Sequence, residues 1–109
     1  MATLDHPSMS DLPIACTLGP AAIAARREDL LGTLVRRAEE RIDLPNGYRV
    51  RFNAEEGLLR TIADVIEVER QCCHFLRFEV IVEPDQRSIW LEFGGPPGSR
   101  EFLAGILDL

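Results

Sequence analysis

The stretch that most constrains the fold is a run of about twenty residues whose apolar side chains recur with helical spacing. In an α-helix each residue is rotated by about 100° from the one before it. When Ile62 is taken as the reference direction, the other apolar side chains of this run point within roughly 60° of it; they are Leu58, Leu59, Val65, Ile66, Cys73 and Leu76. A reciprocal cap between Asn53 and Glu56 would begin such a helix. The spacing therefore predicts one long amphipathic helix from about Ala54 to Phe75.

Strictly alternating segments flank this helix and predict strands. Tyr48–Phe52 precedes it, and Phe78–Val82 and Ile89–Phe93 follow it with a turn between them. The residues before the first strand predict another helix, which starts at Gly19-Pro20 and has helical apolar spacing from Ile23 to Ile42. The sheet is therefore expected to contain three strands, two of them paired as a hairpin.

The two ends of the chain are assigned from shorter patterns. Residues 1–12 are small and polar and predict a flexible N-terminal arm, and 13–18 could form a short edge strand. Ser99 is expected to cap a short C-terminal helix. Residues 13–109 then form a single α+β domain: a two-layer sandwich with a three- to four-stranded, mainly antiparallel sheet, two long helices and a short C-terminal helix.

Charge and composition exclude some classes of function. The net charge is −6, and the 12 basic residues, all arginine, are scattered along the chain, which argues against a nucleic-acid partner. No apolar run approaches the length of a membrane span, and the start lacks the pattern of a secretion signal, so a cytoplasmic protein is expected. With three cysteines in a reducing compartment, no structural disulfide is expected. The sequence leaves open whether the protein forms a homodimer.

The end of the long helix gathers the residue types that could carry chemistry. Glu69 falls about 20° from the centre of the apolar stripe, where a carboxylate costs several kcal/mol unless it is neutral, paired or functional. Cys72 and Cys73 lie three and four residues later, so all three groups can meet around one small volume. Cys16 could add a third thiolate if the lead-in crosses the end of this helix.

This grouping predicts a site for a soft metal ion with Cys16, Cys72 and Cys73 as ligands. Thiolates select Hg(II), Cu(I), Cd(II) or Zn(II), and bind As(III) by the same logic. The helix C-terminus and Glu69 disfavour a preformed thiolate, whereas a bound cation reverses that effect, so metal binding is favoured over reactivity of a free thiol. His74 points away from the stripe, although a zinc site of three cysteines and His74 stays open.

Two alternatives belong to other classes of function. In the first, the cysteines capture a metal bonded to carbon and Glu69 protonates the departing carbon, similar in chemical equipment to organomercurial lyases. In the second, the chain is a protein-interaction module that docks a partner through its sheet edge or an apolar face. The cysteines would then be ordinary core residues, and Glu69 would pair with an arginine; the candidates are Arg49, Arg51 and Arg60.

Residues 69–78 read Glu-Arg-Gln-Cys-Cys-His-Phe-Leu-Arg-Phe, and with them the chain resembles a group of small bacterial proteins with the signature Glu-x-x-Cys-Cys-x-Phe-Leu-x-Phe. The resemblance extends over most of the chain, from Cys16 through 47–52 to 95–102. It implies an association with heavy-metal resistance and supports grouping Cys16 with the vicinal cysteines. A proline commonly follows the second cysteine in that group, whereas this chain has His74.

Overall fold

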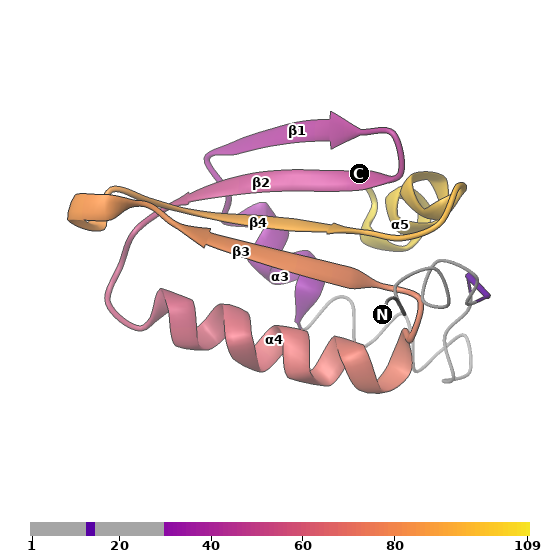
Figure 1. Ribbon diagram of the computed structural model, residues 1–109, viewed down its shortest axis with the longest axis horizontal. Helices are drawn as coiled ribbons and strands as arrows, with labels where there is room; N and C mark the ends of the chain where they lie inside the picture. The colour runs from indigo at the N-terminus through magenta and orange to yellow at the C-terminus, as the bar shows by residue number, and fades with distance from the viewer. Residues whose placement is uncertain (1–12, 15–29) are drawn as a thin grey trace, which may run out of the picture.

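The computed structural model describes residues 13–14 and 30–109, without the side chains of Cys72 and Gln86. The predicted arm at 1–12, most of the lead-in at 13–18 and the start of the first predicted helix lie outside the described residues. The elements follow in the order α3 (Leu31–Arg36), β1 (Glu40–Leu44), β2 (Gly47–Asn53), α4 (Leu58–Cys72), β3 (Arg77–Val82), a 3-10 turn (Pro84–Gln86), β4 (Ser88–Gly94) and α5 (Ser99–Leu107) (Figure 1).

The four strands form one antiparallel sheet in the order β1-β2-β4-β3. β2 and β3 both run antiparallel to β4, so they are parallel to each other on either side of it. α4 connects them as the crossover helix that parallel strands require. α3 contacts α4, and α5 contacts β2 at the end of the sheet where β4 finishes (Figure 1). The predicted α+β class is confirmed.

The core lies between the inner face of the sheet and the helices. The alternation expected for β2 and β4 is observed, and every second residue is buried; these residues are Tyr48, Val50, Phe52, Ile89, Leu91 and Phe93. Ile62 and Val65 of α4 and Leu103 of α5 also belong to the core. Burial of one such large side chain stabilises the folded protein by about 1.5–3 kcal/mol. These residues therefore hold α4 against the inner face of the sheet.

The first predicted helix is wrong at its C-terminal end. α3 stops at Arg36, and Glu40–Leu44 forms strand β1 instead of a helix that continues to Ile42. The Glu39 N–H donates to the Arg51 carbonyl at 2.7 Å, and the Arg51 guanidinium bonds the Glu40 carboxylate at 3.1 Å. Pairing with β2 thus overrides a local spacing that fits helix and strand alike.

The predicted capping box of the long helix is also wrong. Asn53 belongs to β2 and pairs with Ser88, so it cannot cap a helix that begins five residues later. α4 begins at Leu58 after Gly57, which adopts a left-handed conformation with φ 84°. Glycine tolerates that conformation without steric cost. The helix ends at Cys72, with Cys73 as the first residue outside it.

The C-terminal helix forms as predicted, but its cap differs. Gly98, with φ 100°, occupies the N-cap position and Ser99 is the first helical residue. The Ser99 hydroxyl donates to the Pro96 carbonyl at 2.7 Å instead of accepting from the helix. None of the helices in the described part of the chain has the length and apolar character needed to cross a membrane.

Candidate site at the end of α4

The end of α4 places an acid and a sulfur in the interior of the protein. Glu69 and Cys73 are both 0% exposed, and they are separated by four residues, so they lie on the same side of the helix. The Cys73 N–H donates to the Glu69 carbonyl at 2.8 Å, which closes the last helical turn. The structure therefore brings together two of the residues that the sequence grouped.

Cys73 is disulfide-bonded. This corrects the expectation that the chain has no structural disulfide. The expectation rested on the compartment and on the odd number of cysteines, neither of which describes how close the fold brings two sulfurs. The other cysteines of the chain are Cys16, which lies outside the described residues, and Cys72, whose side chain does.

The predicted metal-ligand set is accordingly placed only in part. Cys73 is at the expected position, and the positions of the Cys16 and Cys72 sulfurs are not described. Within residues 13–14 and 30–109, apart from that side chain, no group of three or more histidine, cysteine, aspartate or glutamate side chains is arranged to hold a metal ion. His74 is exposed, and its Nε2 lies 3.1 Å from the Gln71 carbonyl.

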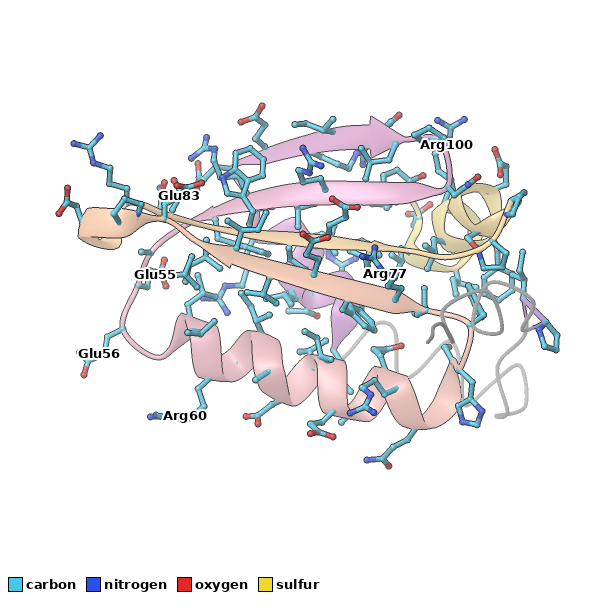
Figure 2. All side chains as sticks on the ribbon, viewed as in Figure 1. Glu55, Glu56, Arg60, Arg77, Glu83 and Arg100 are labelled. Atoms are coloured by element: carbon cyan, nitrogen blue, oxygen red, sulfur yellow. The ribbon has the colours of Figure 1, made fainter. Side chains whose placement is uncertain are left out.

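Glu69 does not form the ion pairs that were considered for it. Arg49 bonds Glu92 at 2.9 Å and Arg51 bonds Glu40 at 3.1 Å, both on the face of the sheet opposite α4. Arg60 is exposed and points away from the sheet (Figure 2). The Glu69 Oε2 atom accepts no hydrogen bond within the described residues, although the residue makes another polar interaction.

The loop after α4 is held against the sheet by a close backbone contact. A Cβ atom at Gly95 would lie 2.8 Å from the Phe75 carbonyl oxygen, so only glycine fits there. The Phe75 ring packs edge-on against Phe102 of α5, with centroids 5.4 Å apart. This role of Gly95 was not predicted from the sequence. The run of three glycines and two prolines at 94–98 was the available signal.

A groove of about 660 Å³ opens at the end of the sheet beside this loop. The β1–β2 turn and the last residues of β4 form its walls, and Phe75 lies on the side of α4. Its charged groups are Arg77 and the ion pair between Arg49 and Glu92. The groove therefore adjoins the segment that follows Cys73: Phe75, two residues later, and Arg77, four residues later, both line it.

Tyr48 is the one tyrosine of the chain and lies under the same end of the sheet. Its hydroxyl is 3.4 Å from the Arg100 carbonyl, and the Arg41 guanidinium lies 5.7 Å from the ring centroid. Burial, with a smaller effect of the Asp43 carboxylate, raises the pKa of Tyr48 above its ordinary value of 10.0. Tyr48 is therefore a neutral core residue and not a candidate acid near neutral pH.

Comparison of the chain with known protein families, with curated proteins and with solved structures finds no match.

Proposed function

We propose that the reduced protein binds a thiophilic metal ion through Cys73 and the cysteine that is its disulfide partner in the oxidised form. The observation that supports this most directly is the disulfide at Cys73, because two sulfurs close enough to bond can also approach one ion. Reduction supplies two thiols, and a soft ion such as Hg(II), Cu(I), Cd(II) or Zn(II) replaces their protons.

Cys16 is the favoured partner. Sulfurs of a disulfide usually come from residues with Cα atoms 4.4–6.8 Å apart, whereas consecutive Cα atoms across a trans peptide are about 3.8 Å apart. Cys72 and Cys73 are consecutive, and no cis peptide bond occurs in the described part of the chain. General disulfide geometry therefore favours a bond to Cys16, which would leave Cys72 as a thiol that is not part of the disulfide.

The position of Cys73 at the end of a helix favours a binding role over a redox role. The C-terminal end of a helix carries partial negative charge, which disfavours a thiolate nucleophile and favours a bound cation. Because the dithiol must be reduced before it binds, the binding step belongs in a reducing compartment, and we place it in the cytoplasm. Heavy-metal resistance is the context that the resemblance implies.

The test is a titration of reduced protein with Hg(II), Cu(I) or Zn(II), with detection by thiolate-to-metal absorbance. We expect saturable binding by wild type, a much smaller absorbance change in Cys73→Ser and in Cys16→Ser, and weaker binding in Cys72→Ser. Wild type oxidised before the titration is the matched control, because it has the same residues without the dithiol. Equal absorbance changes in wild type and Cys73→Ser would contradict the proposal.

A second candidate is cleavage of a bond between carbon and mercury, favoured by the complete burial of Glu69 one turn before Cys73. The two thiolates would hold the metal, the carbon–metal bond would break, and the Glu69 proton would pass to the carbon. Removal of a carboxylic acid from water favours its protonated form. The products would be a hydrocarbon and a mercury dithiolate, with Glu69 left as the carboxylate.

This candidate is tested by incubating reduced protein with an organomercurial and excess thiol. Release of hydrocarbon should occur with wild type and be lost in Glu69→Gln, which keeps the size of the side chain. Glu67→Gln is the control, because Glu67 is exposed on the same helix. If the wild-type protein bound Hg(II) but released no hydrocarbon, the proposal of metal binding would stand and the enzymatic proposal would be refuted.

A further inference from the structure

β3 is one edge of the sheet, and no strand of the described residues pairs with the side of β3 that faces away from β4. The Glu83 N–H donates to the Ser88 carbonyl at 3.0 Å, and hydrogen-bonded pairs alternate along an antiparallel ladder. Ile81 and Glu79 therefore pair with β4 through their backbone groups. The backbone N–H and C=O groups of the even-numbered residues, Phe78, Val80 and Val82, face away from β4.

The side chains of this edge give it only part of the usual protection against pairing, since its charged residues are Arg77 and Glu79 alone. Ile81 is 39% and Val82 is 56% exposed, and the strand contains no proline or lysine. Natural edge strands are commonly shielded by such residues or by bulges. β1, the other edge, instead carries charges at three of its five positions.

β3 contains two charged residues, Arg77 and Glu79, whose side chains approach each other to 3.7 Å, and a third, Glu83, directly follows the strand. Arg77, with a side chain 66% exposed, begins the strand, and Glu83 follows it in an extended conformation with ψ 154°. Figure 2 shows the two side chains near opposite ends of β3. A second copy related by a two-fold axis would run antiparallel and bring each Arg77 to the other copy's Glu83.

The register of such a pair is determined by three conditions. Residues opposite each other must lie on the same face of the continued sheet, and the free backbone groups of one copy must meet those of the other. With Val80 at the two-fold axis, Phe78 faces Val82 and Arg77 faces Glu83. A shift by two residues in either direction places Glu79 against Glu79 or against Glu83, which is repulsive.

We infer that β3 is a homodimer interface, in which two copies pair antiparallel about Val80 to form a continuous eight-stranded sheet. Apolar contact between Phe78 and Val82 and two Arg77–Glu83 pairs select this register over the shifted ones. The inference is independent of metal binding, since neither Glu69 nor any cysteine lies on this strand.

Charge exchange tests the register by sedimentation velocity at low salt. We expect a dimer for wild type, with a dissociation constant raised on the order of tenfold in Arg77→Glu and in Glu83→Arg, because each changes two symmetric pairs. The double variant Arg77→Glu/Glu83→Arg should regain most of the lost affinity. Arg60→Glu, on the exposed face of α4, is the matched control and should leave the dissociation constant unchanged.

Amide hydrogen exchange provides a second readout that does not depend on substitution. The amides of Phe78, Val80 and Val82 should become protected as the protein concentration rises, whereas those of Glu79 and Ile81 should be protected at every concentration. A monomer at millimolar concentration would overturn the inference. The inference would also be overturned if the double variant formed a dimer no tighter than that of the single variants. The same holds if the amides of Phe78, Val80 and Val82 exchanged at the same rate at all protein concentrations.

Discussion

The disulfide at Cys73 makes a quantitative prediction about stability. A bond between Cys16 and Cys73 closes a loop of about 58 residues, and the loss of chain entropy in the unfolded state then stabilises the protein by about 4 kcal/mol. A bond between Cys72 and Cys73 closes almost no chain and would contribute little by this mechanism. Reduction should therefore remove a large part of a stability that is ordinarily about 5–15 kcal/mol.

The assay is urea unfolding of wild type with and without a phosphine reductant. With an m-value of about 1.5 kcal/mol/M, the loss of about 4 kcal/mol lowers the midpoint by roughly 2–3 M. Cys16→Ser and Cys73→Ser should unfold like reduced wild type whether or not reductant is present. Cys72→Ser is the matched control and should keep both the high midpoint and its sensitivity to reductant.

Two results would refute this reasoning. If Cys72→Ser lost as much stability as Cys73→Ser, the bond would join the adjacent cysteines. If reductant left the midpoint of wild type unchanged while mass spectrometry showed that the bond had been cleaved, the disulfide would not stabilise the fold. Peptide mapping of the non-reduced protein identifies the bonded pair independently of either measurement.

Three further predictions concern residues that stabilise the fold around the site. Tyrosinate absorbance should titrate with a midpoint above 10 in the folded protein and near 10 in denaturant, because burial raises the pKa of Tyr48; stability should fall as the pH rises past 10, where only the unfolded state has lost the proton. Gly94→Ala should cost about 1–3 kcal/mol in urea unfolding, since its Cβ would lie 2.5 Å from the Asn46 carbonyl oxygen, whereas Gly105→Ala, with no neighbour within 4 Å, should add about 0.5–1 kcal/mol. Leu91→Ala, at a fully buried position, should lower the thermal midpoint with a cost of about 2–5 kcal/mol, and an unchanged midpoint would contradict the assigned core.

The parts of the fold that follow from local patterns could be predicted from the sequence. The alternation in Tyr48–Phe52 and Ile89–Phe93 identified both central strands, and the apolar stripe around Ile62 identified α4 and its buried face. In each case a single helix or strand buries one of its faces in the core, and the spacing of its apolar residues shows which face that is. Glu69 was placed on that face by the same argument, and the structure buries it completely.

The parts that depend on pairing between distant residues could not be predicted in this way. β1 forms because Glu40 and Arg51 meet across a hairpin, and helical spacing alone gives no sign of that contact. Asn53 fails as a cap because it is already paired in β2. The disulfide at Cys73 likewise depends on where a second sulfur lies in space, which the spacing of cysteines along the chain does not determine.

The most direct test of the proposed metal site is X-ray absorption spectroscopy of the reduced protein with one equivalent of Hg(II). The account predicts two or three sulfur neighbours around the metal in wild type and one fewer in Cys73→Ser. A first shell made only of nitrogen and oxygen atoms, or the same number of sulfur neighbours in both proteins, would contradict it.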